Sequence, residues 1–574
     1  MIAFSSMVDL LRHRAAEQPT DRAYVFLSET GAEEAVLTFA DLDRRAGMVA
    51  ACLATQLQKG DRALLMFPPG LEFIVAFFAC LAAGVIAAPV MPPRRTSARD
   101  ASENIIADCS PRVVLTTSAL LENRPEIVTC LQKANIERLA IDALPQGSED
   151  DRAPLLELSR EDVAFLQYTS GSTSAPKGVT VTHGNLLDNL EMIRIALGNT
   201  PHSTYAAWIP FYHDMGLILN VLESLYLGAL CVVQSPTSFI QRPLSWLRTI
   251  SRYRAEVACA PNFAYDLCVS RFRANQMDGI NLSTWKVALN GSEPVRAATI
   301  EQFTATFAPY GFDPQTMYPA YGMAEATLLI SGGHRSGEVV LRAVSREALQ
   351  RNIIAAAKDE GDARVLVGCG RRLVGEDIAI VHPETLKRLS PDQVGEIWVR
   401  GPNVAIGYWQ NAAATAATFE AQIAGEGGEH WLRTGDLGFL DDAGEIYITG
   451  RIKDVIIIYG TNHYPQDIET TMQDAHPALR KNCGAAFSIV DQRGEEKLVL
   501  VQEVERTQRH QISGAEIVAC IREAVGNEHD IAVHRIALIR PGTIPKTTSG
   551  KIQRSLTQRL WQEGALQLLS SADA

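Results

Sequence analysis

The chain changes its secondary-structure pattern along its length, and this change limits its fold more than any other sequence feature. Up to about residue 330, short apolar runs such as 62–67 and 112–116 alternate with amphipathic stretches. Strands that alternate with helices are typical of parallel sheets in an α/β protein. From about 365 to 450 the segments become short, β-like and rich in turns, which favours a small barrel or an antiparallel sheet. A second α/β pattern then runs from residue 451 to the end.

The length of the chain indicates more than one domain. A chain of 574 residues is too long for a single compact core. We expect an N-terminal domain over 1–450 and a smaller C-terminal domain over 451–574. Neither a long linker nor a low-complexity tract separates them. The boundary is therefore predicted to act as a hinge.

One apolar segment, 73–91, raises the question of whether the chain inserts into membranes. It carries no charge and is long enough to span a bilayer. Gly84 and Pro89 interrupt it, and its Ala-rich first half gives way to β-branched residues. We expect a buried helix followed by a buried strand, and no stable membrane insertion.

Charge and cysteine usage exclude several classes of protein. The net charge is −13 and no dense basic run occurs, so nucleic-acid binding is not expected. The ten cysteines form no Cys-x-x-Cys pair and no zinc-ligand spacing, which is typical of reduced buried thiols. The N-terminal stretch lacks a basic start followed by a long apolar run, so we expect no signal peptide and a cytoplasmic protein.

The segment 168–179 has the chemistry of a phosphate-binding loop (YTSGSTSAPKGV). Small hydroxylated residues and Gly171 let the backbone approach an anion, and Lys177 adds a positive charge. An apolar strand at 163–166 leads into the loop. The Gly-x4-Gly-Lys-Ser/Thr spacing of a Walker A loop is absent. A Ser/Thr/Gly-rich surface loop is the alternative interpretation.

Together with five further blocks, this loop resembles the adenylate-forming superfamily of acyl-CoA synthetases, luciferases, peptide-synthetase adenylation domains and fatty acyl-AMP ligases. The blocks occur in the expected order over nearly the whole chain: 211–217 (FYHDMGL), 290–294 (NGSEP), 321–325 (YGMAE), 434–438 (TGDLG) with 450–451 (GR), and 545–551 (PKTTSGK). The resemblance implies a large N-terminal domain of two α/β subdomains plus a small β-barrel, and a small mobile C-terminal α/β domain. It also implies ATP and Mg²⁺ as cofactors.

The resemblance further implies which residues hold the nucleotide. The loop binds phosphates, the 290–293 segment lies along the purine, Tyr321 packs on adenine, and Asp436 with Arg451 reaches the ribose. The predicted nucleotide-binding set is Thr169, Ser170, Gly171, Ser172, Thr173, Lys177, Gly178, Asn290, Gly291, Ser292, Glu293, Tyr321, Gly322, Met323, Ala324, Asp436 and Arg451.

Three residues are predicted to be catalytic. Lys551 offers an ammonium that would offset negative charge while a carboxylate attacks the α-phosphate. Glu325 is the predicted Mg²⁺ ligand, as the matching Glu is in the family. His213 matches an aromatic or His residue that gates the acyl pocket, and a structural core histidine is the alternative. Lys453 lies at the predicted hinge, and Lys546 is a nearby lysine without a predicted role.

Departures from the acyl-CoA synthetase pattern indicate a fatty acyl-AMP ligase. Ala324 stands where Thr is usual, and an Ala- and charge-rich segment at about 342–364 lengthens the chain. Fatty acyl-AMP ligases carry an insertion here and read Ala-Glu-Ala-Thr, as 324–327 do; the 459–469 segment also resembles theirs. We hypothesise that the insertion packs between the domains and limits the rotation that admits CoA.

The sequence therefore predicts a ligase that converts a fatty acid, expected to be long-chain, into acyl-AMP and pyrophosphate. The acyl group would then pass to the phosphopantetheine of an acyl carrier protein, or of a carrier domain in a polyketide or peptide synthase. One alternative is a fatty acyl-CoA synthetase. Another is a non-catalytic nucleotide-binding protein, which the intact Lys177, Glu325, Asp436 and Lys551 disfavour. A peptide-synthetase module is not expected, because no carrier or condensation domain follows.

Overall fold

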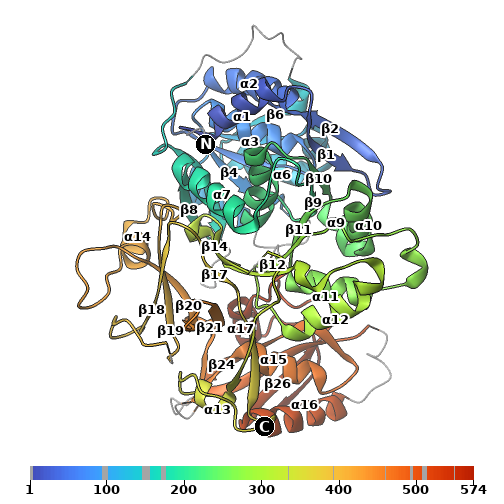
Figure 1. The fold of residues 1–574 in the computed structure, drawn as a ribbon, viewed down its shortest axis with the longest axis vertical. Coiled ribbons are helices and arrows are strands. Elements are labelled where there is room, and N and C mark those ends of the chain that lie inside the picture. Colours follow the sequence, from blue (N-terminus) through green and yellow to red (C-terminus); the bar gives the residue numbers. More distant parts are fainter. Residues whose placement is uncertain are drawn as a thin grey trace.

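The computed structural model has two large sheets in its N-terminal part and a smaller one at its C-terminal end (Figure 1). In Figure 1 the orange and red C-terminal elements lie at the opposite end of the molecule from the blue N-terminal helices. The structure describes residues 4–93, 101–144, 156–169, 176–333, 335–391, 393–458, 461–491, 496–506, 514–547 and 550–573.

The first sheet has six strands in the order β6-β5-β3-β4-β7-β8. All neighbours are parallel except β7 and β8, which form an antiparallel pair. The strands are β3 (Arg62–Met66), β4 (Ile86–Val90), β5 (Val113–Thr116), β6 (Glu137–Ala140), β7 (Val163–Thr169) and β8 (Lys177–Thr182). Every residue of β4 and β5 is buried, as expected for short apolar runs in a sheet that is covered on both faces.

The uncharged segment 73–91 forms helix α3 (Glu72–Ala82) followed by strand β4, as predicted. Residues 73–81 of α3 are buried, because the helix packs against helix α2 (Phe39–Ala54) and against strands of the first sheet. Among the described residues, no helix is both long and apolar enough to cross a bilayer.

The second sheet has nine strands in the order β17-β14-β13-β12-β11-β9-β10-β1-β2. The strands from β13 to β1 run parallel, and antiparallel strands flank them on both sides. The strands are β1 (Arg22–Leu27), β2 (Glu33–Thr38), β9 (Tyr205–Ala207), β10 (Cys231–Gln234), β11 (Val257–Pro261), β12 (Val287–Gly291), β13 (Met317–Gly322), β14 (Leu329–Gly332) and β17 (Arg371–Arg372). The largest apolar core of the protein joins side chains from both sheets.

Helices cover and connect the two sheets, as the alternating sequence pattern predicts. Beyond α2 and α3, the α-helices of this part are α1 (Met7–Glu17), α4 (Ala101–Cys109), α5 (Ser118–Asn123), α6 (Pro125–Lys133), α7 (His183–Leu197), α8 (Glu223–Leu227), α9 (Pro236–Gln241), α10 (Leu244–Tyr253), α11 (Asn262–Ser270), α12 (Ala297–Phe307) and α14 (Ala412–Phe419). A π-helix spans Met215–Leu222, and short 3₁₀ turns span Ile141–Ala143, Ala274–Gln276, Ala308–Tyr310, Pro314–Thr316, Ala324–Ala326 and Ile452–Asp454.

The turn-rich region forms an antiparallel sheet of four strands in the order β18-β19-β20-β21. These are β18 (Asp377–Val381), β19 (Gly395–Arg400), β20 (Leu432–Leu440) and β21 (Ile446–Arg451). The sequence allowed a small barrel or an antiparallel sheet here, and Gly368, directly after the segment Ala363–Val367, extends this sheet through an isolated bridge to Tyr447 of β21.

The predicted insertion at 342–364 adopts a defined structure. It lies mostly in a hairpin of β15 (Leu341–Ser345) and β16 (Ala363–Val367), with helix α13 (Arg346–Leu349) in the connection. Its buried side chains share an apolar cluster with residues of β20, β21 and Tyr464. The insertion therefore contacts residues on both sides of the predicted domain boundary.

The small C-terminal domain contains a four-stranded sheet in the order β24-β25-β26-β27. Its elements are β22 (Ile456–Ile458), β23 (Thr461–His463), α15 (Pro465–Asp474), β24 (Leu479–Val490), β25 (Glu496–Val504), α16 (Gly514–His529), β26 (Val533–Ile539), α17 (Arg554–Gln562) and β27 (Leu568–Asp573). Apart from Tyr464, its buried apolar residues form two clusters separate from the main core. A separate core is what a domain able to move as a unit requires.

Candidate active site

A cleft of about 1920 Å³ lies between the large and the small domain. Its walls include the carboxyl ends of β12 and β13 and, from the small domain, residues of the segments 462–473, 546–547 and 550–556. In α/β sheets, ligands bind beyond the carboxyl ends of parallel strands. Predicted site residues that line this cleft therefore lie in a position where folds of this kind bind ligands.

The predicted phosphate loop joins β7 to β8. Thr169, the last residue of β7, pairs with Lys177, the first residue of β8. Gly178 faces the Tyr168 ring, where an added Cβ would lie 3.0 Å from the ring carbon Cζ. Ser170, Gly171, Ser172 and Thr173 lie outside the described residues, so the loop itself remains a prediction. The hairpin places Lys177 at the cleft.

Glu325 is held in the cleft by a short 3₁₀ turn. Its side chain is buried, and its Oε1 accepts a hydrogen bond of 2.9 Å from the Tyr408 hydroxyl. Burial raises the pKa of the Glu325 carboxyl above its usual value. The Nζ of Lys177 lies 4.5 Å from the centre of the Tyr408 ring, so one tyrosine contacts both charged residues.

A second charged group forms at the strands β13, β20 and β21. Asp436 accepts a hydrogen bond of 2.8 Å from the Tyr321 hydroxyl, and its other oxygen lies 2.8 Å from Nε of Arg451. Attraction to Asp436 is the main reason why the pKa of the Arg451 guanidinium rises. The carboxylate of Asp436 is therefore fixed in position and lies at the cleft surface.

The 290–293 segment follows strand β12 into the cleft. Gly291 lies so close to β13 that an added Cβ would come within 2.9 Å of the carbonyl oxygen of Ala320, which requires glycine here. Ser292 has a positive φ of 70°, so the chain turns sharply at this point. Glu293 accepts a 2.5 Å hydrogen bond from the backbone N–H of Phe263, and burial raises the pKa of its carboxyl.

The YGMAE block continues from β13 into the turn that carries Glu325. At Gly322 an added Cβ would lie 1.9 Å from the carbonyl oxygen of Leu328, so only glycine fits. Met323 and Ala324 follow it along the cleft wall. The sequence motif is thus a tight backbone turn with one carboxylate at its end.

His213 and Asp214 form an adjacent pair at the start of the π-helix. Nδ1 of His213 lies 2.5 Å from Oδ1 of Asp214, which also accepts a 2.7 Å hydrogen bond from the Met215 N–H. Burial alone would raise the pKa of Asp214, but His213 and then Lys551 lower it below its usual value. His213 therefore lines the cleft beside a carboxylate with a shifted pKa, and such carboxylates are typical of functional sites.

Lys551 reaches the cleft from the small domain. It follows Gly550, whose φ of +90° and contact with Phe263 exclude a side chain. Burial lowers the pKa of the Lys551 ammonium, and Asp214 is the strongest opposing charge. Lys546, in contrast, lies with its Nζ 3.4 Å from the Cys483 sulfur. The two lysines of this segment therefore differ in the groups that surround them.

Lys453 lies in the turn Ile452–Asp454 directly after β21 and lines the cleft. Its neighbour Asp454 pairs with Arg554, which also binds Glu469 through two hydrogen bonds of 2.6 and 2.7 Å. The turn is therefore tied to the small domain on its C-terminal side, and the hinge role of Lys453 stays a prediction.

Positive groups and carboxylates from segments far apart in the sequence meet in this cleft. Lys177, Arg451 and Lys551 supply positive charge, while Glu325 and Asp436 supply carboxylates. Cations suit phosphate groups, and a buried carboxylate suits hydroxyl groups or a divalent metal. The arrangement can hold a nucleotide triphosphate and stabilise charge that develops at its phosphates.

Comparison with known proteins decides the family. The model of the family described as AMP-binding enzyme matches residues 11–409. The chain belongs to the AMP-binding enzyme family. A second model, described as the AMP domain of Disco-interacting protein 2-like proteins, matches residues 453–571 of this AMP-binding enzyme.

Relatives match this enzyme over almost its whole length. It is 45% identical to the medium-chain-fatty-acid–[acyl-carrier-protein] ligase JamA of Moorena producens, over 98% of this chain and 96% of that protein. It is 36% identical to the similarly named ligase TtuA of Teredinibacter turnerae, over 96% and 92%. A fatty acyl-adenylate ligase from Legionella pneumophila, solved with acyl adenylate and pyrophosphate, matches with a TM-score of 0.76, 38% identity and coverage of 99% and 98%. The adenylate-forming fold and the use of ATP are therefore properties of this enzyme's family.

Sequence reasoning missed Tyr408 as a candidate site residue. It lies in a loop remote from all six motif blocks, and only the fold brings it against Glu325 and Lys177. Its one local indication is the Gly-Tyr-Trp run at 407–409, which is rich in turn and aromatic residues. Asp214 stood within a recognised block but received no role, because its contact with His213 and its closeness to Lys551 depend on the fold.

Proposed function

We propose that this AMP-binding enzyme activates a fatty acid as acyl-AMP and then transfers the acyl group to the phosphopantetheine of an acyl carrier protein. The observation that carries the proposal is that Lys551, from the small domain, reaches a cleft that also contains Glu325 and the Asp436–Arg451 pair. The named activities of JamA, TtuA and the Legionella enzyme support it.

In the first step the fatty-acid carboxylate attacks the α-phosphorus of ATP. A new oxygen–phosphorus bond forms, and the bond to the leaving pyrophosphate breaks. Lys177 and the loop before it would hold the phosphates, Tyr321 would pack on the adenine, and the Asp436 carboxylate would accept hydrogen bonds from the ribose hydroxyls. Positioning supplies most of the rate enhancement in such transfers at phosphorus.

Lys551 would act on the charge that accumulates in this step. The attacking carboxylate and the α-phosphate are both negative, so an ammonium between them stabilises the transition state more than the separate substrates. Burial makes this interaction stronger than it would be in water. Asp214 opposes the effect of burial on the pKa of this ammonium.

Glu325 would hold Mg²⁺ together with the ATP phosphates. The described residues contain no cluster of three or more acidic, His or Cys groups that could bind a metal alone. One carboxylate is sufficient for this ion, because Mg²⁺ usually binds through one or two carboxylates and the substrate phosphates. When bound, the metal neutralises phosphate charge. Tyr408 would orient the Glu325 carboxylate through its hydrogen bond.

The insertion hairpin supports transfer to a carrier protein rather than to CoA. Arg364 lies 3.0 Å from Asp467 and 4.8 Å from the centre of the Tyr464 ring, both in the small domain. Arg346 pairs with Glu528 of helix α16. These contacts tie the hairpin to the small domain, so they would oppose the rotation about the predicted hinge at Lys453 that CoA-using relatives undergo.

The proposal also covers the chain length of the fatty acid and the cellular location of the enzyme. The expected long-chain substrate stays a prediction, while the carrier-protein ligases JamA and TtuA are named for medium-chain acids. A cytoplasmic location is supported by buried thiols at positions such as Cys80, Cys231 and Cys268.

The test is an exchange assay of labelled pyrophosphate into ATP, run with fatty acids of graded length. The proposal predicts exchange that depends on the fatty acid and on Mg²⁺, with the best chain length defining the substrate. Amino acids serve as the control and should support no exchange. If no fatty acid supports exchange, the enzyme does not form acyl adenylates and the proposal is wrong.

A further inference from the structure

The strand β24 of the small domain contains a bulge beside the active-site cleft. Its pairing with β25 shifts register between Leu479 and Gly484. Within the bulge, Asn482 adopts a positive φ of 56°, which is uncommon for residues other than glycine. Its backbone N–H donates a 2.5 Å hydrogen bond to Oε1 of the buried Gln473. Bulges that re-aim a side chain are typical next to functional sites.

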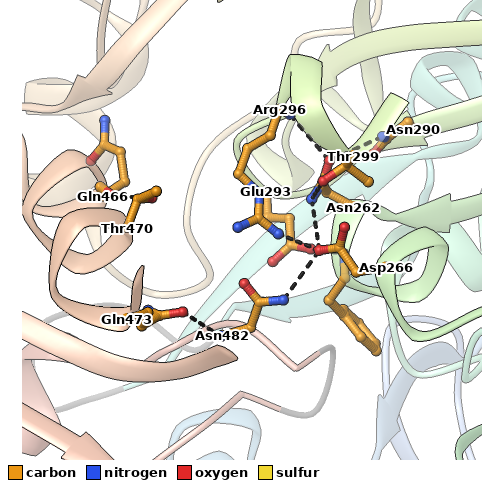
Figure 2. Close-up of polar contacts among 11 residues, drawn as sticks. Asn262, Asp266, Asn290, Glu293, Arg296, Thr299, Gln466, Thr470, Gln473 and Asn482 are labelled. Carbon is orange, nitrogen blue, oxygen red and sulfur yellow. Dashed lines mark hydrogen bonds and ion pairs between the residues drawn. The ribbon is translucent and has the colours of Figure 1, made fainter. Parts of the chain in front are cut away.

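The bulge directs the Asn482 side chain across the cleft to the large domain (Figure 2). Its Nδ2 donates a 3.1 Å hydrogen bond to Oδ2 of Asp266 on helix α11. The same carboxylate oxygen pairs with Arg296, which holds it in place from its own domain. A hydrogen bond to a carboxylate is stronger than one between neutral groups.

Helix α11 also supports the 290–293 segment, which is predicted to lie along the purine. At its first residue, the buried Asn262 accepts hydrogen bonds of 3.3 Å from the Asn290 side chain and 3.1 Å from the Arg296 N–H. Asn262 in turn donates a 3.0 Å hydrogen bond to Thr299. Figure 2 shows that this network and the Asn482 contact converge on the start of α11. The helix therefore connects the 290–293 segment to the small domain.

The start of α11 also contacts the loop that carries Lys551. The Phe263 ring packs against Gly550, where an added Cβ would lie 2.9 Å from the ring. Phe263 donates its backbone N–H to Glu293. Two successive turns of one helix thus contact the lysine loop and the bulge of β24, which are both parts of the small domain.

We propose that the Asn482–Asp266 hydrogen bond is a latch that holds the small domain in the orientation that places Lys551 for adenylate formation. Asn482 and Asp266 are positioning residues, since their effect on the reaction passes through Lys551. This inference rests on the proposed function, because it assigns the two residues to the first of its two half-reactions.

The latch gives a reason for the positive φ of Asn482, which destabilises the strand unless a contact compensates for it. A left-handed residue in a bulged strand is strained, and such strain persists only where the surroundings enforce it. The hairpin contacts at Arg346 and Arg364 join the small domain to the insertion, whereas the latch joins it to helix α11. The latch therefore joins the small domain to the helix that supports the 290–293 segment, which is predicted to bind the nucleotide.

The variants are chosen so that folding is preserved. Asn482→Gly removes the side chain while keeping the positive φ, which alanine would not tolerate. The matched control is Asn135→Gly, at an exposed asparagine with a φ of 53° outside the cleft lining. The third variant combines Asp266→Asn with Asn482→Asp, which exchanges the two side chains and restores one amide–carboxylate hydrogen bond.

The measurement separates the half-reactions. Pyrophosphate exchange reports adenylate formation, and carrier loading from supplied acyl-AMP reports transfer. Asn482→Gly should lower the kcat of exchange by roughly three- to tenfold with little change in the KM for ATP, because one charged hydrogen bond is lost. Loading from supplied acyl-AMP should stay within about twofold of the parent, a change too small to count as a lost interaction. The exchanged pair should be faster than Asp266→Asn alone, since both lack the ion pair with Arg296 but only the exchanged pair regains an amide–carboxylate hydrogen bond. Asn135→Gly should match the parent.

Each other outcome overturns the latch. An unchanged exchange rate in Asn482→Gly would show that the contact is not needed, and an equal loss in both half-reactions would show a general structural role. An exchanged pair no faster than Asp266→Asn alone, which loses the ion pair with Arg296 to the same extent, would show that the hydrogen bond is not the cause. If the parent enzyme itself performs no exchange, the proposed function fails instead, so the two failures are distinct.

Discussion

Two lysines in the segment 545–551 differ in their surroundings, and this difference allows a paired test. Both line the cleft, but Lys551 faces Asp214, whereas Lys546 lies against Cys483. We expect Lys551→Ala to lower adenylate formation by about 10²- to 10³-fold, the usual cost of removing one preorganised transition-state contact. Lys546→Ala should cost much less in the same exchange assay. Equal losses in the two variants would contradict the assignment of Lys551.

The hydroxyl of Tyr321 is expected to affect nucleotide binding through Asp436. Tyr321→Phe keeps the ring but removes the 2.8 Å hydrogen bond to the carboxylate. The KM for ATP should rise by about tenfold, because a hydrogen bond to a charged group is lost. Tyr318→Phe is the control, since Tyr318 lies on the same strand and donates to the Ala196 carbonyl. A rise in KM in both variants would indicate a general effect on β13.

The pH dependence of adenylate formation should report the Lys551 ammonium. Burial lowers its pKa, so the charged form is lost at a lower pH than for an ordinary lysine. The charged form exists below this pKa, and the exchange rate should therefore fall as the pH rises through it. Lys551→Arg keeps its charge to much higher pH, so its residual rate should lack this alkaline decline. The same decline in both proteins would exclude Lys551 as its source.

At the scale of single elements, the insertion hairpin is expected to limit the use of CoA. Replacing both Arg346 and Arg364 by Gln removes the ion pairs with Glu528 and Asp467. Acyl-CoA should then become detectable by chromatography in reactions with ATP, fatty acid and CoA. Arg342→Gln is the control, because Arg342 lies on the same hairpin but stacks over Phe439 of the large domain. If neither the double variant nor removal of 342–364 yields acyl-CoA, the hairpin is not the only barrier.

Elements whose residues are close in sequence could be predicted well. The buried helix and strand at 73–91 and the YGMAE turn depend on local apolar runs and on glycine, and both appear in the structure. Tyr408, Asp266 and Asn482 could not be found this way, because their contacts join residues more than seventy positions apart.

At the scale of the whole molecule, the two domains contribute different parts of one site. The large domain carries Glu325, Asp436 and the predicted nucleotide-binding segment 290–293, and the small domain supplies Lys551. A site divided in this way is complete only in one relative orientation of the domains, so a second orientation can serve a second half-reaction. The hairpin and the latch both act on this orientation, which links the choice of acyl acceptor to the placement of one lysine.

The most direct test of this account is a competition between acceptors. The enzyme is incubated with ATP, Mg²⁺ and its preferred fatty acid, and with CoA and a phosphopantetheinylated acyl carrier protein at equal concentration. The account predicts acyl-AMP and acylated carrier protein, with little or no acyl-CoA. Acyl-CoA as the main product would contradict it, and would make the enzyme a CoA ligase in which the hairpin at 342–364 has another role.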